Sequence, residues 1–303
     1  MIDRFCYDVY VPSLAREIKF YELDNAAYMT ILKFLQNNDD DGLCMFLEGL
    51  IETLCVDYTL CNNLNRLDKY CIILTMIMIS VGNVLEYNVT CRETEQEYKI
   101  EIKINEIISK INNIQVKEHR VTMSNGGEVV VSLPMSLSSN FASIISSVKF
   151  GKKTYDLTTM NEEQLDTIIS SLPYNVFEKI KKQYNVVHEQ CGEIIYYSYK
   201  SPYIKDAVST EYKFNIFDNT FFDFIKLLLN EDLLNYYKMF YSITTKFKFD
   251  MQYVQSITPS ETKMYMSFIK EDIKHKQDQI EASRNKNSPG LSVAPPVDPS
   301  LGD

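Results

Sequence analysis

The amino-acid sequence predicts a helix-rich α+β fold, and three of its patterns lead to that prediction. Over most of the chain apolar residues recur every three to four positions, which is typical of amphipathic helices. In several short blocks they alternate with polar residues instead, as in antiparallel strands with one buried face. After Ala282 the chain has no aromatic residue and four of its nine prolines, which is typical of a disordered segment.

We therefore expect four units along the 303 residues. With 45% hydrophobic and 24% charged residues, the chain can bury a substantial core. The units are an N-terminal strand pair with a three-helix subdomain (1–83), a β-hairpin element (84–135), a helical subdomain with a second β element (136–282) and a disordered tail (283–303).

The first unit begins with two short strands within residues 5–22, separated by a turn at Pro12-Ser13. The first helix then has apolar residues at i, i+3, i+4 and i+7, namely Tyr28, Ile31, Leu32 and Leu35. The second helix begins at the acidic run Asp39 to Asp41, which suits the positive end of a helix dipole. The third ends at Gly82, the residue type preferred just after a helix.

The second unit contains two hairpins. Apolar and charged residues alternate strictly from Tyr98 to Ile104, so we expect a strand there, paired with residues 87–90. The other hairpin runs from Val116 to Val131 and turns at Asn125-Gly126. We expect a type I′ turn, which requires positive φ at both central residues.

The third unit is mainly helical. Capping boxes at Thr159–Glu162 and Thr258–Glu261 each predict a helix start, the second with proline at the first helical position. Between them, Cys191 to Phe217 form a second β element, and aromatic-rich helices follow over residues 218–273. The same order of elements occurs at Cys91 to Ile104, which is compatible with a degenerate internal repeat or with chance.

Composition restricts the compartment and the partners. The seven cysteines are odd in number and mostly lie among apolar residues, which favours free thiols in a reducing compartment. The N-terminus lacks the pattern of a signal peptide, and the most apolar run, residues 71–81, is shorter than the ~20 residues that span a bilayer. We expect a soluble cytosolic protein. A net charge of −10 argues against nucleic acid, and we expect no membrane partner either.

We expect no catalytic, cofactor-binding or metal-binding residues. Zinc sites on hairpins use Cys-x-x-Cys pairs, whereas Cys91 and Cys191 each stand alone in their β element. The sequence has no nucleophile elbow and no glycine-rich phosphate loop. One alternative stays open, a cytosolic enzyme of unknown type that uses Cys191 with His188, three residues earlier.

The aromatic helices offer a candidate docking surface. Large aromatic side chains anchor many protein interfaces, and four of them cluster within one predicted helix. We therefore select Tyr236, Tyr237, Phe240 and Tyr241 as candidate partner-binding residues. The same side chains could instead be buried in the protein's own core, and their periodicity alone does not decide between the two.

Several stretches also follow one another in a familiar order. They are Tyr7–Leu14 with Arg16–Leu23, then Cys91–Ile104, Phe222–Ile225, Tyr236–Tyr241 and Thr258–Glu261. This order resembles that of the T4-type bacteriophage baseplate hub and hub-assembly proteins. Some members of that family have paired cysteines in the β element, where this chain has single ones, so a metal-stabilised form is not implied here.

The resemblance implies a non-enzymatic structural or assembly protein of the baseplate's central hub. Its partners would be other phage baseplate or tail proteins, and it would act in the host cytoplasm during assembly. Whether it stays in the virion is left open by the sequence. A protein-interaction adaptor unrelated to phages is the remaining alternative.

Overall fold

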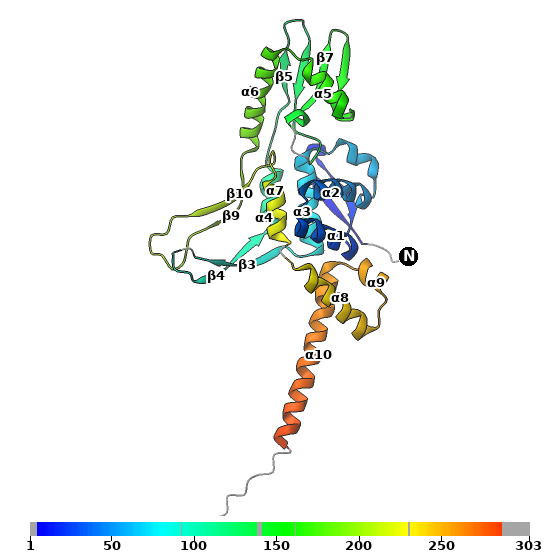
Figure 1. Ribbon diagram of the computed structural model, residues 1–303, viewed down its shortest axis with the longest axis vertical. Coiled ribbons are helices and arrows are strands. Elements are labelled where there is room, and N and C mark those ends of the chain that lie inside the picture. Colours follow the sequence, from blue (N-terminus) through cyan, green and yellow to red (C-terminus); the bar gives the residue numbers. More distant parts are fainter. Residues whose placement is uncertain (1–4, 92, 138–140, 161, 230, 287–303) are drawn as a thin grey trace, which may run out of the picture.

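In the computed structural model, three parts extend from a central helical body (Figure 1). A four-stranded sheet with two helices lies at one end, two long β-hairpins project to one side, and a long C-terminal helix extends from the other end. The structure describes residues 5–286 except 92, 138–140, 161 and 230. The prediction of a helix-rich α+β fold with small antiparallel sheets is confirmed.

The N-terminal part has the predicted strand pair and three helices. Asp39 caps the second helix by accepting a hydrogen bond from the Gly42 amide, and Gly82 follows the third. The turn after the first strand is held to the third helix, because Ser13 Oγ donates to Asp68 Oδ2 at 2.5 Å. The elements are β1 (Cys6–Val11), η1 (Pro12–Leu14), β2 (Arg16–Tyr21), α1 (Asn25–Asn37), α2 (Asp40–Leu54), η2 (Tyr58–Asn63) and α3 (Arg66–Ser80).

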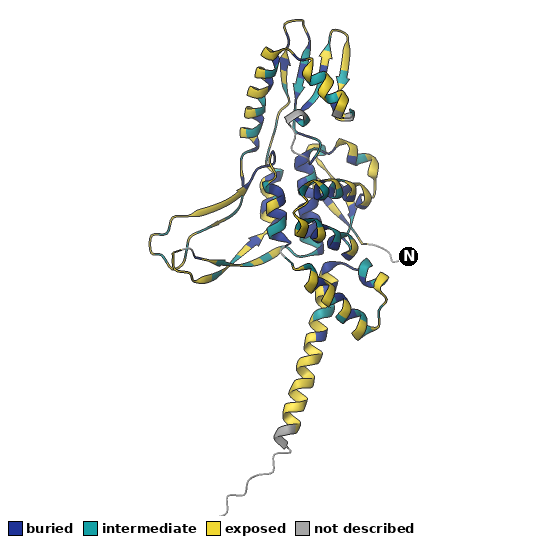
Figure 2. Ribbon diagram, viewed as in Figure 1, coloured by how far each residue is buried: buried dark blue, intermediate teal, exposed yellow. Residues whose placement is uncertain are grey.

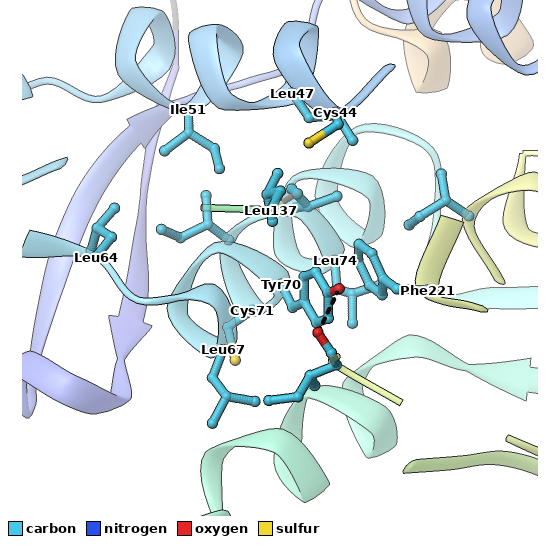
Figure 3. Packing of buried hydrophobic residues seen from close by; sticks show 14 of the residues in the cluster. Cys44, Leu47, Ile51, Leu64, Leu67, Tyr70, Cys71, Leu74, Leu137 and Phe221 are labelled. Carbon is cyan, nitrogen blue, oxygen red and sulfur yellow. Dashed lines mark hydrogen bonds between the residues drawn. The ribbon is translucent and has the colours of Figure 1, made fainter. Parts of the chain in front are cut away.

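Helix α3 is the centre of the hydrophobic core, with nearly all of its residues buried. Figure 3 shows Tyr70 of α3 against Phe221, whose rings stack with centroids 3.5 Å apart. Cys44 and Cys71 also lie in this core, and six of the seven cysteines are buried with free thiols. The cysteines therefore pack as small apolar side chains, as the sequence predicts.

The first hairpin pairs β3 (Val84–Thr90) with β4 (Glu97–Lys103). Its predicted alternation is confirmed, since Tyr98, Ile100 and Ile102 are more buried than the charged residues between them. The strand ends one residue earlier than expected, because Ile104 begins helix α4 (Ile104–Asn112). That helix was not predicted. It buries Ile104, Ile107 and Ile111 and packs against α3.

The predicted hairpin at Asn125-Gly126 is part of a larger sheet. Four antiparallel strands lie in sequence order, and this sheet extends across residues 135–136, where the sequence suggests a division between units. The strands are β5 (His119–Thr122), β6 (Glu128–Val131), β7 (Ile145–Phe150) and β8 (Lys153–Asp156), with short helices η3 (Phe141–Ile144) and η4 (Leu157–Thr159).

The turn between β5 and β6 differs from the predicted type I′ turn. Gly126 has φ +77°, but Asn125 does not have a positive φ, so only one left-handed residue is needed. The Gly126 amide donates to the Met123 carbonyl at 3.0 Å, and the Met123 amide donates to the Gly127 carbonyl at 2.8 Å. The longer turn still requires glycine at position 126.

Two helices accompany this sheet, α5 (Glu162–Ser170) and α6 (Tyr174–Cys191). Helix α6 packs on β5 and β6 through an apolar stripe that includes Val176, Ile180 and Val187. The capping box predicted at Thr159–Glu162 includes residue 161 and lies outside the described residues.

The second hairpin pairs β9 (Ile194–Tyr199) with β10 (Thr210–Phe214) and projects beside the first (Figure 1). Its exposed end carries stacked tyrosines, with the rings of Tyr197 and Tyr199 5.2 Å apart. The two hairpins meet where Ser201 Oγ donates to Cys91 Sγ at 3.1 Å. The two similar stretches, Cys91 to Ile104 and Cys191 to Phe217, thus lie in neighbouring antiparallel hairpins, the first contributing one strand and the second two.

The C-terminal part consists of α7 (Thr220–Leu228), α8 (Leu233–Phe247), α9 (Met251–Ser256) and α10 (Pro259–Lys286). The capping box at the start of α10 is confirmed, since the Thr258 amide donates to Glu261 Oε2 at 2.7 Å and the Glu261 amide to Thr258 Oγ1 at 3.2 Å. Helix α10 continues to Lys286, so residues 283–286 are helical where a disordered tail was predicted. The rest of that predicted tail, from residue 287, lies outside the described residues.

Candidate docking surfaces

The four aromatic residues selected from the sequence divide between the two faces of α8. Tyr236 and Phe240 are buried, with exposed fractions of 0% and 1%, whereas Tyr237 and Tyr241 are 43% and 71% exposed. Residues one position apart on a helix point in directions about 100° apart, so one of two neighbouring tyrosines can be buried while the other is exposed. Of the four, only Tyr237 and Tyr241 are available to a partner.

Tyr236 is held inside by a polar cluster as well as by packing. Its hydroxyl donates to Asn25 Oδ1 on α1 at 2.5 Å, and its ring lies 5.1 Å from that of Tyr28. Burial, and then the negative charge of Glu231, raise the pKa of Tyr236 above its ordinary value. This phenol therefore stays protonated and acts as a hydrogen-bond donor between α8 and α1.

The outer face of α8 carries a short apolar stripe, formed by Leu234, Tyr237 and Tyr241 at positions i, i+3 and i+7; we call it the α8 stripe. Leu234 is 59% exposed. It was not selected from the sequence, although its spacing from the two tyrosines is the signal that could have identified it. Three large exposed apolar side chains on one helix face are typical of a protein-binding surface.

A cleft lies where the central body meets the C-terminal helices. Its volume is about 470 Å³, and its lining includes Tyr28, Tyr87, Leu229, Glu231 and Lys263. Tyr28 Oη donates to Glu231 Oε2 at 3.0 Å across one side of the cleft. A second cleft of about 390 Å³ shares Leu229 and Glu231 with it. Both clefts combine aliphatic walls with carboxylates, and the first adds two tyrosines, a mixture that suits a side chain from a partner protein.

The pair that an enzyme would use, His188 and Cys191, lies in the last turn of α6. Burial raises the pKa of Cys191 to about 12, so its thiol is not activated as a nucleophile. His188 Nε2 lies 3.0 Å from the side-chain amide of Asn215, and its ring packs against Phe217. The partner of the imidazole is therefore an amide, which also orients the histidine in Cys-His-Asn triads, so it is the raised pKa of the Cys191 thiol that counts against a catalytic pair.

A comparison with protein families identifies the family to which this chain is related. A model of the family described as T4 bacteriophage base plate protein matches residues 5–193. The chain belongs to this family. The predicted resemblance to T4-type baseplate proteins is confirmed by this match, which covers more than half of the chain. Searches of curated proteins and of solved structures find no match.

The match places the parts of this baseplate protein in two groups. The region from β1 to α6, with the strand pair, the core helices and the four-stranded sheet, lies within the family range. The second hairpin, α7, α8 and α10 follow it, so the α8 stripe lies outside that range.

Two further observations concern the described part of this baseplate protein. No described helix combines the length and the apolar character needed to cross a membrane. Among the same residues, no group of three or more His, Cys, Asp or Glu side chains is arranged to hold a metal ion.

Proposed function

We propose that this baseplate protein acts at the central hub, as a structural or assembly component, through contacts with other phage proteins and without a catalytic step. The family match carries the proposal, because it establishes a phage baseplate protein. The hub is the part of the baseplate that the resemblance of the N-terminal and C-terminal stretches implies.

The surface proposed for these contacts is the α8 stripe. Leu234, Tyr237 and Tyr241 offer a leucine and two tyrosines, and aromatic anchors at the centre of an interface supply much of its binding energy. The chain carries 41 acidic against 31 basic residues, and this excess limits nonspecific association with other acidic proteins. The partner we expect is a phage baseplate subunit with an apolar groove.

We also propose where the protein acts. Free, buried cysteines are compatible with the reducing cytoplasm of the host, where we propose that the protein acts during assembly. The non-enzymatic role is supported by the high pKa of the buried Cys191 thiol.

Affinity capture of the tagged protein from infected cells, followed by mass spectrometry, tests this function. Recovery of central hub subunits supports it. Recovery of peripheral baseplate subunits alone would leave the family membership intact and overturn the hub position. Recovery of host proteins without any tail protein would favour the adaptor alternative. Mass spectrometry of purified virions then decides whether the protein remains in the mature particle.

A further inference from the structure

Helix α10 extends well beyond the part of the protein that covers it. Near its start Thr262 and Ile269 are buried, and Asp272 pairs with Lys246 in the last turn of α8, with Nζ 2.6 Å from Oδ2. Every residue from Lys270 to Ser283 is exposed, and Figure 2 shows this segment as a projecting rod. We call residues 270–286 the α10 stalk; at 1.5 Å per residue it is about 25 Å long.

The stalk carries an apolar stripe that continues the buried face of the same helix. The face that packs inward contains Thr262, Met266 and Ile269, and the same spacing of four and three residues leads on to Ile273, then Lys276, then Ile280. These two isoleucines are 50% and 54% exposed. They lie seven residues apart, the repeat with which helices pack side by side in a coiled coil.

An isolated helix of this length is marginally stable in water, so pairing of the stalk with another helix would stabilise it. Helix α8 cannot supply that cover, because it ends at Phe247, next to the residue that pairs with Asp272. A separate helix that presents apolar residues at the same spacing, with suitable charges beside them, fits the stalk.

The stalk itself meets this description when a second copy lies antiparallel to it. That orientation places Ile273 of each copy against Ile280 of the other. On one side of the stripe, Glu281 of one copy then falls between Lys270 and Lys274 of the other, at both ends of the pair. A parallel copy in register would instead place Glu281 level with Glu281 of the other copy, seven residues from Lys274, and these attractive contacts would be lost.

The distribution of charge also favours contact through the stalk. Helix α10 contains six Lys or Arg and five Asp or Glu, whereas the whole chain contains 31 and 41. The remaining part of each copy is therefore strongly acidic, and two copies repel each other at short range. Antiparallel stalks keep the acidic bodies at opposite ends while the nearly balanced helices meet.

We propose that two copies of this chain associate through antiparallel pairing of their α10 stalks. The interface consists of the Ile273–Ile280 contacts, flanked by Glu281 between Lys270 and Lys274. This interface is separate from the α8 stripe. An experiment can therefore contradict the pairing of two copies without contradicting the docking to a baseplate subunit, and the reverse.

Sedimentation velocity of the full chain over a range of concentrations tests this proposal. We expect a monomer–dimer equilibrium that is lost when Ile273 and Ile280 are both replaced by Gln. Both positions are exposed, so circular dichroism should show an intact fold in this variant. A wild-type protein that stays monomeric at every concentration, or a dimer that survives the double replacement, would overturn the proposal.

Charge reversal tests the antiparallel orientation. Glu281→Lys should weaken the dimer roughly tenfold, because two attractive contacts become repulsive at each end. Adding Lys270→Glu and Lys274→Glu should restore it. Asp278→Lys makes the same change in charge on the opposite face of the helix and should leave the dimer unchanged. Failure of the triple variant to restore association would contradict the antiparallel arrangement.

Discussion

Tyr236 on α8 and Asn25 on α1 are joined by a hydrogen bond of 2.5 Å between the tyrosine hydroxyl and the asparagine carbonyl oxygen. The amide nitrogen of Asn25 donates to the Val254 carbonyl at 2.6 Å and to Thr262 Oγ1 at 2.7 Å. A single buried asparagine near the N-terminus therefore connects α1 to three C-terminal helices. This cluster sets which face of α8 is buried and leaves the α8 stripe on the outside.

Replacement of Asn25 by Ala should lower the free energy of unfolding by about 3 kcal/mol, since several buried polar groups lose their partners. Tyr236→Phe removes one hydroxyl and should cost about 1 kcal/mol. Chemical denaturation measures both changes. Tyr237→Phe, on the exposed face, is the control and should have little effect. Equal stability of the Asn25 variant and the wild type would contradict the role of this cluster.

A second buried polar residue, Arg66, should matter at least as much. Its Nε donates to the Ser136 carbonyl and its Nη1 to the Ile216 carbonyl, each at 2.7 Å, so it connects α3 to two distant segments. Arg66→Met keeps much of the volume but leaves these carbonyls without the guanidinium donors. We expect a loss of about 3 kcal/mol, measured as a lower midpoint of denaturation. An unchanged midpoint would show that these contacts contribute nothing to stability.

The contact between the two hairpins should make stability depend on pH. Hydrogen bonds from Ser201 and Thr94 lower the pKa of the Cys91 thiol to about 7, so the folded protein releases this proton at a lower pH than the unfolded chain. Between pH 7 and the ordinary thiol pKa of about 9, the unfolded state binds more protons, and this contribution to stability increases with pH.

Denaturation of the wild type and of Cys91→Ala at pH 6 and pH 9 checks this sign. The wild type should gain stability relative to the variant at the higher pH. Ser201→Ala should reduce that gain, because it removes the largest cause of the shift. A gain at pH 6 instead would mean that the thiol is not favoured as an anion in the folded state.

Much of the fold could be predicted because its signals are local. Asp39 and the Thr258–Glu261 box form helix caps through residues three positions apart, so the sequence alone identifies them. Helix α4 was missed because Ile104 continues the alternation of the preceding strand, although Ile104, Ile107 and Ile111 have the i, i+3 and i+7 spacing of a helix. Strand β7 was missed because its pairing with β6 is what gives a short, partly apolar segment its structure.

Only part of the candidate site could be predicted, because the exposure of its side chains depends on long-range contacts. The sequence indicates that α8 is rich in aromatic residues, but the choice between Tyr236 and Tyr237 depends on Asn25, more than 200 positions earlier. The prediction covered aromatic residues alone, so it did not include Leu234, which belongs to the same exposed stripe. Long-range contacts, rather than helix propensity, decide which side chains a partner can reach.

Site-specific photo-crosslinking tests most directly whether the α8 stripe contacts another baseplate subunit. A photoreactive phenylalanine analogue replaces Tyr241 in protein expressed during infection. Tyr58 on η2, with 70% exposure against 71% for Tyr241, is the matched control position. We expect covalent capture of a phage baseplate protein from position 241 and much less from position 58. Equal capture at both positions, or none at position 241, would contradict this contact.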